Sequence, residues 1–309
     1  MFDDQHLLPV DRGRIIEGLR DFITRLAPSD WMAIVSLGRT SRTLVPFTNS
    51  KESLLDGLTR LEKMAPPGLA WDSQFRLQVN EIRRSNPRSR SSLVRTWAEQ
   101  VRAREDGSLQ DLQRAVSALA ARSGKRTLIF VSRGFELHPG QTLFAAIGPG
   151  INKFDYSVAD AWQKVIDEAN RGGVTIHALD GRGLVAEADA SESAPPLVSA
   201  FLDNQTRRET LAGLAEETGG TLVFERNFFP AALDQIYRDS GSYYLVGVTL
   251  TSLDPKKATH DVKVTSTRPG VKVRARKRYA PMSADGAARN RAEMALITPD
   301  ATGEFPIAV

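Results

Sequence analysis

Apolar residues recur along most of the chain either at helical spacing or in the short runs that mark buried strands. Residues 11–26 carry one apolar helical face, whereas residues 127–131 form a continuous apolar and β-branched run typical of a fully buried strand. The predicted helices are residues 11–26, a helix capped by Ser50, 93–104, a helix capped by Ser108, 158–172, a helix from Thr206 to Gly219, and 230–239. The predicted strands before residue 240 are residues 31–37, 43–47, 127–131, 174–179 and 221–225.

Breaks in this pattern come from proline, glycine and capping residues. Pro66-Pro67-Gly68 and the Ser/Arg-rich run 85–92 predict a largely irregular segment over residues 65–92, with some helix within it. Gly107 is expected to separate two helices, with Ser108 capping the second. Thr206 and Glu209 form a capping-box pattern that predicts the start of a helix.

Strands that alternate with helices predict an α/β fold with a mostly parallel, Rossmann-like sheet and helices on both faces. The alternation stops after residue 239. Residues 243–250, 260–267 and 271–279 are three strand-like segments without intervening helices, and we expect them to extend the sheet in antiparallel fashion.

The composition is that of an ordinary globular protein, with 309 residues, 41% hydrophobic and 25% charged. No run approaches the length of a membrane-spanning helix, and the first residues show no signal peptide. The chain has no cysteine, which excludes disulfides, thiolate chemistry and cysteine-ligated metal sites.

The net charge of +4 is unevenly distributed. Residues 76–104 contain eight arginines against two glutamates, and residues 272–278 contain a second basic cluster. Such clusters can attract nucleic acid or anionic lipid. Because no aromatic interleaving suggests a stacking platform for bases, we interpret them as a solvated face and a charged edge strand, without nucleic acid as a partner.

Motifs of enzyme chemistry are missing from the sequence. There is no G-x-S-x-G elbow, no H-E-x-x-H pair and no phosphate-binding P-loop. The four histidines are widely spaced, and His177 lies inside a predicted strand, where a core role is expected. We therefore expect no catalytic residues and no cofactor.

Several segments together resemble the bacterial von Willebrand factor A-related domains. They are residues 2–7, 30–61, 124–137, 173–184, 211–224, 240–250 and 271–281. The resemblance covers residues 1–282 as one domain, with residues 283–309 as a tail or linker towards a following domain. In that family the first strand is central and longer, so we expect this chain to lack most of it, since only Met1 and Phe2 precede Asp3.

The resemblance also implies where a metal would bind. The family's site begins with Asp-x-Ser-x-Ser after the first strand and continues with Thr-Asp-Gly after the fourth. If Asp3 holds the first position, Gln5 and Leu7 replace both serines, and Ser132-Arg133-Gly134 puts an arginine at the carboxylate position. We therefore expect a degenerate site without a metal, in which Asp3 and Asp4 cap the next segment or pair with Arg133.

Ligands of open α/β sheets bind at the carboxyl ends of the strands. The candidate binding residues at that edge are Asp3, Asp4, Gln5, Ser132, Arg133 and Asp180. The leading hypothesis is a non-enzymatic protein-interaction or adhesion module, which the resemblance implies to be extracytoplasmic. Two alternatives stay open: a binding domain that depends on a weak Mg²⁺ or Mn²⁺ site, and a nucleic-acid-binding protein or hydrolase that uses the basic clusters.

Overall fold

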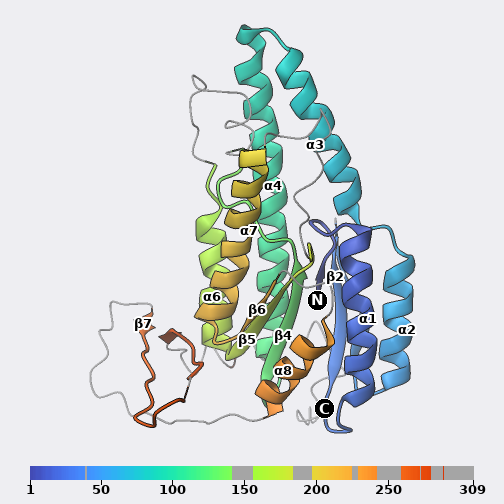
Figure 1. Cartoon of the computed structure of the whole chain (residues 1–309), viewed down its shortest axis with the longest axis vertical. Coiled ribbons are helices and arrows are strands. Elements are labelled where there is room, and N and C mark those ends of the chain that lie inside the picture. The colour runs from blue at the N-terminus through green and yellow to red at the C-terminus, as the bar shows by residue number, and fades with distance from the viewer. Residues whose placement is uncertain are drawn as a thin grey trace, which may run out of the picture.

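The computed structural model describes residues 1–38, 40–140, 156–183, 197–224, 229–241, 259–271 and 273–279, together with Ala288. Its centre is a six-stranded sheet with the order β3-β2-β1-β4-β5-β6 (Figure 1). Every neighbouring pair is parallel except β2 and β3, which form the expected antiparallel hairpin. The strands are β1 (Phe2–Asp3), β2 (Met32–Leu37), β3 (Ser41–Thr48), β4 (Arg126–Ser132), β5 (Val174–Asp180) and β6 (Leu222–Val223).

Helices cover both faces of this sheet, which confirms the predicted α/β architecture. One face packs against α1 (Pro9–Arg25), α2 (Lys51–Lys63) and α8 (Pro230–Gly241). The other packs against α4 (Pro87–Ala120), α6 (Ala159–Gly172) and α7 (Leu197–Glu217). Strands with apolar side chains on both faces, such as β5, need this double cover because parallel sheets bury both sides.

Strand β1 lies between much longer neighbours. Phe2 pairs with Ser36 on one side and Val131 on the other. The amino group of Met1 donates a hydrogen bond to the Ile129 carbonyl at 2.9 Å. Burial lowers the pKa of this amino group to about 5, although the charge of Asp4 acts in the opposite direction.

Residues 65–92, expected to be largely irregular with some helix, are mostly helical. Helix α3 (Pro67–Arg84) and the first half of α4 fill this segment. Pro67 and Pro87 each occupy the first position of a helix, where the missing N–H costs no hydrogen bond. Asn86 caps α4 by accepting a hydrogen bond from the Ser89 amide.

Two predicted helix starts are wrong because both residues lie inside longer helices. Helix α4 runs unbroken through Gly107, and Ser108 is buried within it rather than capping it. Helix α7 begins at Leu197, so Thr206 is an interior residue. Where the pattern carried stronger signals the prediction is confirmed: Ser50 caps α2, and Gly173 ends α6 in the left-handed conformation.

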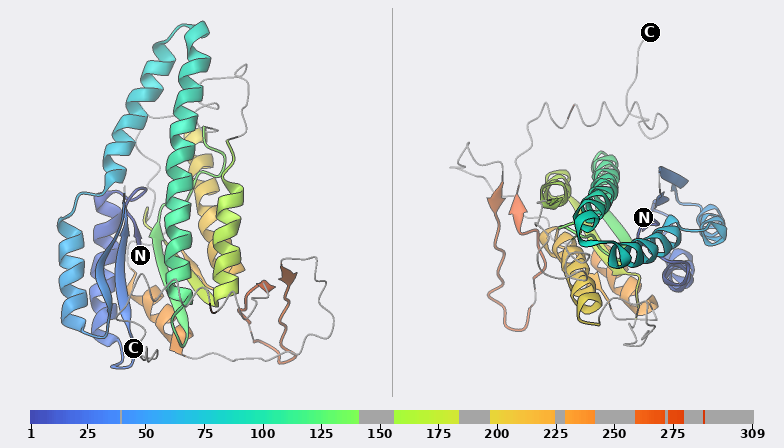
Figure 2. Two further views of the ribbon diagram at one scale, coloured as in Figure 1. Left: turned by 180° about the vertical axis from the view of Figure 1, so that it is seen from behind. Right: turned by 90° about the horizontal axis from the view of Figure 1, so that it is seen from above.

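The C-terminal strands do not extend the central sheet within the described residues. Strands β7 (His260–Asp261) and β8 (Arg278–Tyr279) form a separate antiparallel pair (Figure 2). Lys277 next to β8 pairs with Glu216 at the end of α7, so charge attraction draws this basic segment to a helix end rather than to a sheet edge. The predicted strand 243–250 lies outside the described residues, as do most of residues 283–309.

Candidate functional site

The carboxyl ends of three central strands bring most of the predicted site residues to one edge of the sheet. Asp3 ends β1, Ser132 ends β4 and Asp180 ends β5. The Ser132 hydroxyl donates a hydrogen bond to Asp3 Oδ2 at 2.7 Å. The Ser132 carbonyl accepts one from the Gly181 amide at 3.0 Å. The three strand ends are thus linked directly.

A buried histidine lies between two buried carboxylates at this edge. His6 Nδ1 is 2.6 Å from Asp3 Oδ2, and His6 Nε2 is 3.0 Å from Glu105 Oε1. All three side chains are at most 3% exposed. Since each ring nitrogen faces a carboxylate oxygen, the arrangement suits a doubly protonated imidazolium.

The pKa shifts of the histidine and its second partner agree with this assignment. Burial acts to lower the pKa of His6, but the attractions of Asp3 and Glu105 together outweigh it, so the pKa of His6 is raised. Burial acts to raise the pKa of Glu105, but the charges of His6, Arg207 and Arg104 lower it to about 2. Glu105 is therefore ionised at neutral pH.

Two arginines complete the charge balance around Glu105. Arg104 Nη1 and Arg207 Nη1 each lie 3.7 Å from Glu105 Oε1. Arg207 also pairs with Glu136 at 3.2 Å, and Arg104 donates a hydrogen bond to the Gln5 carbonyl. This network ties the loop after β1 to helices α4 and α7.

The remaining acidic residues of the edge have cations of their own. Arg12 Nη1 lies 3.1 Å from Asp4 Oδ1, and Ser36 donates a hydrogen bond to Asp4 Oδ2. Burial raises the pKa of Asp4, although Ser36 and Arg12 both act against the shift. Arg182 binds both oxygens of Asp180, with Nη2 2.6 Å from Oδ2 and Nε 2.9 Å from Oδ1.

Arg133 pairs with an acidic residue that the sequence did not single out. Its Nε lies 3.5 Å from Asp11 Oδ2 in the first turn of α1. The expected partners Asp3 and Asp4 pair with His6 and Arg12 instead. Arg133 therefore neutralises the carboxylate of Asp11 in α1 and not that of Asp3 at the end of β1.

Exposure divides the six candidate binding residues into two groups. Asp3, Asp4, Ser132 and Asp180 are at most 1% exposed, so they organise the edge from within. Gln5 and Arg133 are partly exposed, and the Arg133 side chain is 30% exposed. Contact with a ligand at this edge would therefore involve Gln5 and Arg133 first.

The residues present do not fit a divalent metal at the position that the resemblance implies. The side chain of Leu7 is fully buried in the apolar core and has no oxygen, and Asp3 Oδ2 is already hydrogen-bonded to His6. Among the described residues, no group of three or more acidic or histidine side chains is arranged to hold a metal ion. Hard cations such as Mg²⁺ need several oxygen ligands, which this edge does not assemble.

No protein-family model matches the chain, and no curated protein is significantly similar to it.

Within the part of the chain that the structure describes, every helix is too short or too polar to cross a membrane.

Proposed function

We propose that this chain is a non-enzymatic protein-binding module of the von Willebrand factor A type, which uses the carboxyl edge of its sheet without a metal ion. The α/β architecture supports the choice of surface, because open parallel sheets bind ligands at that edge. One observation carries the proposal: each buried carboxylate described there lies within 4 Å of a cation of the same chain. The pairs are Asp3–His6, Asp4–Arg12, Asp11–Arg133, Glu105–His6 and Asp180–Arg182.

Internal cations change what the edge can bind. A buried carboxylate must be paired or coordinated because an isolated buried charge is very costly. In a metal-dependent domain the ion supplies that positive charge, whereas here His6 and the arginines supply it. A divalent ion would have to displace them, which favours recognition of a partner through hydrogen bonds and ion pairs at Gln5 and Arg133.

A metal-dependent binding domain is the second candidate, and one observation favours it. Asp3 Oδ1 and Glu105 Oε2 are buried and accept no hydrogen bond from a described residue. Free carboxylate oxygens are ligands that Mg²⁺ and Mn²⁺ prefer. We rank this candidate second because the imidazole of His6 lies between these two carboxylates and holds the other oxygen of each.

Affinity capture tests the proposal. The full chain, immobilised, is expected to retain the same partner from its native extract in EDTA and in Mg²⁺. Arg133→Glu should abolish capture because it reverses the partly exposed charge of the edge. The matched control is Arg60→Glu on the exposed face of α2, which should leave capture unchanged. Capture that needs Mg²⁺, or that survives Arg133→Glu, contradicts the proposal.

The extracytoplasmic location is also part of this proposal, and it rests on the family resemblance alone. Fusing the protein to a reporter that is active only outside the cytoplasm tests it directly. An inactive reporter on a stably expressed fusion would contradict this part.

A further inference from the structure

Helices α3 and α4 form an arm that projects beyond the sheet on the side of its carboxyl edge (Figures 1 and 2). The base of the arm touches that edge, since the Gly68 amide donates to the Asp4 carbonyl at 3.0 Å. Helix α4 has 34 residues, which corresponds to a length of about 50 Å. Its second half packs on the sheet through Leu109, Leu112 and Val116, whereas its first half packs on α3.

A small apolar core of its own stabilises the arm. It consists of Val79, Ile82, Val94, Trp97 and Val101, with Trp71, Phe75 and Leu93 at its margin. The rings of Trp71 and Trp97 stack with their centroids 4.8 Å apart, and Arg104 lies over Trp71. The arm is therefore a formed structural element that holds its tip in a defined place.

The tip of the arm is strongly basic. Residues 82–98 contain five arginines and no acidic residue. Arg90 is used structurally, because it donates to the Arg83 and Ser85 carbonyls and closes the turn between the helices. Arg83, Arg84 and Arg88 have no ion pair with any residue that the structure describes.

The second basic cluster of the sequence behaves differently. Arg274 pairs with Asp239, Lys277 with Glu216 and Arg278 with Glu217. These ion pairs hold the C-terminal segment against α7 and α8, so their cations are already neutralised. The contrast singles out the tip of the arm as a positive surface that the described fold does not neutralise.

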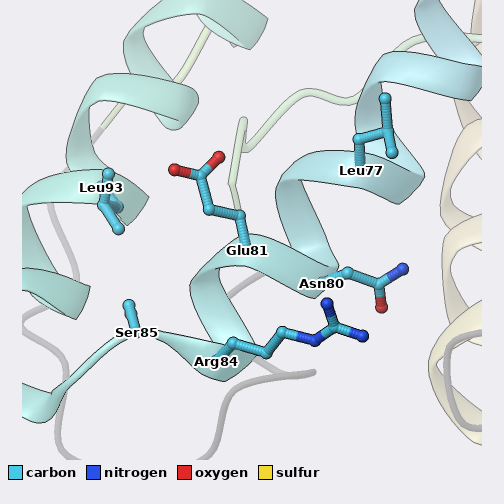
Figure 3. A pocket seen from close by; sticks show the side chains of 6 residues that line it. All are labelled: Leu77, Asn80, Glu81, Arg84, Ser85 and Leu93. Atoms are coloured by element: carbon cyan, nitrogen blue, oxygen red, sulfur yellow. The ribbon is translucent and has the colours of Figure 1, made fainter.

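Apolar groups lie beside these cations. A shallow, open cavity of about 680 Å³ is lined by Leu77, Asn80, Glu81, Arg84, Ser85 and Leu93 (Figure 3). Leu77 is 70% exposed, and Glu81 extends from α3 between Leu77 and the neighbouring helix. Within the described residues, the tip thus combines arginines that have no ion pair, an aliphatic wall of Leu77 and Leu93, one amide and the carboxylate of Glu81.

We propose that the tip of the arm is a docking site for an acidic, leucine-bearing segment of a partner protein. Arginine binds carboxylates through paired N–H groups, and the aliphatic wall would receive the apolar side chain of such a segment. A nucleic-acid backbone has no apolar group to pack on Leu77 and Leu93. The described tip also has no exposed aromatic side chain to enter a bilayer or to stack on bases.

This inference goes beyond the proposed function, since it assigns a second surface that acts through charge and not through the sheet edge. Binding of a synthetic glutamate-rich peptide that contains two leucines tests it, measured by fluorescence anisotropy on the full chain. The triple variant R83Q/R84Q/R88Q is expected to weaken binding by about tenfold or more, and added salt should weaken binding to the wild type. The matched control R42Q/K51Q/K63Q removes three charges from the region of β3 and α2 and should bind as the wild type does.

Two further experiments test the contribution of the leucines and show whether a loss of binding reflects a loss of folding. Leu77→Ser, or a peptide with serine in place of leucine, should weaken binding less than the triple variant does. A variant with Arg83, Arg84 and Arg88 changed to glutamate should instead bind a lysine-rich peptide, which shows that a loss of binding is not a loss of folding. Absence of peptide binding, equal binding by the triple variant, or tighter arginine-dependent binding of duplex DNA or phosphatidylglycerol vesicles would overturn the proposal. Arg133→Glu is expected to leave peptide binding intact, so this test and that of the sheet edge can fail independently.

Discussion

The imidazole of His6 lies 3.0 Å from Glu105, which is 99 residues further along the chain. This contact joins the loop after the short central strand to the middle of the longest helix. Both side chains are almost completely buried, so the pair depends on complete charge compensation. Asp3 and two arginines provide the rest of that compensation.

Removing the charge of Glu105 should therefore destabilise the chain. We expect Glu105→Gln to lower the free energy of unfolding by on the order of 3 kcal/mol near pH 5.5, because it leaves the His6 cation with one partner. Urea unfolding of both proteins measures this difference. The control Glu62→Gln removes an exposed partner of Arg20 and should change stability by less than about 1 kcal/mol.

The effect of Glu105→Gln should depend on pH in a defined way. The pKa of His6 is raised, so its contribution is complete below its ordinary pKa of about 6.5 and disappears as the pH rises through the folded value. The pKa of Glu105 is lowered to about 2, so its contribution is complete above its ordinary value and disappears as the pH falls towards 2. The difference between the two proteins should be largest between these limits, and a difference that does not vary with pH would contradict the assignment of an imidazolium.

Gly134 fixes the turn that follows β4. Its φ is +85°, and an added Cβ would lie 2.1 Å from the Arg207 carbonyl oxygen. We expect Gly134→Ala to cost roughly 3 kcal/mol or more, from backbone strain and overpacking together. Gly124 has a similar φ of +79° with no atom near its Cβ position, so Gly124→Ala should cost only about 1–2 kcal/mol. Equal losses in thermal unfolding would show that the contact with Arg207 does not constrain this turn.

The arm should lose its structure independently of the sheet. Trp97 is 2% exposed and central to the apolar core of the arm. Trp97→Ala should destabilise that core by about 3–5 kcal/mol and make residues 67–104 sensitive to protease. Amide exchange in β4 and β5 should stay slow, whereas Leu77→Ala at an exposed position of α3 should change neither property. Faster exchange throughout the sheet would mean that the arm and the sheet unfold as one unit.

The sequence predicted the strands of the sheet better than it predicted helices α3 and α4, which extend beyond the carboxyl edge of the sheet. The apolar runs of β4 and β5 and the capping residues Ser50 and Gly173 are local signals, and the structure confirms them. Pro66-Pro67-Gly68 misled the prediction because proline interrupts a helix but is favoured at its first position, which Pro67 occupies in α3. Capping patterns at Ser108 and Thr206 failed because tertiary packing continues the helix through them.

At the candidate site, strand ends alone were enough to bring Asp3, Ser132 and Asp180 together, since parallel strands end at one edge. The partners of these residues were missed because pairing such as that of His6 with Glu105 joins distant parts of the chain. One signal was available: Glu105 continues the apolar stripe of Trp97, Val101 and Leu109 at intervals of four residues. A carboxylate in such a stripe indicates a buried ion pair.

Calorimetric titration of the full chain with Mn²⁺ and Mg²⁺ tests the central claim, that cations of the chain take the place of a metal at the sheet edge. We predict no binding in the sub-millimolar range and no rise in melting temperature. An occupied site would stabilise the fold by about 2.7 kcal/mol at a hundredfold excess over Kd. Sub-millimolar binding that disappears in Asp3→Asn, with the melting temperature rising only in the unsubstituted protein, would contradict the claim.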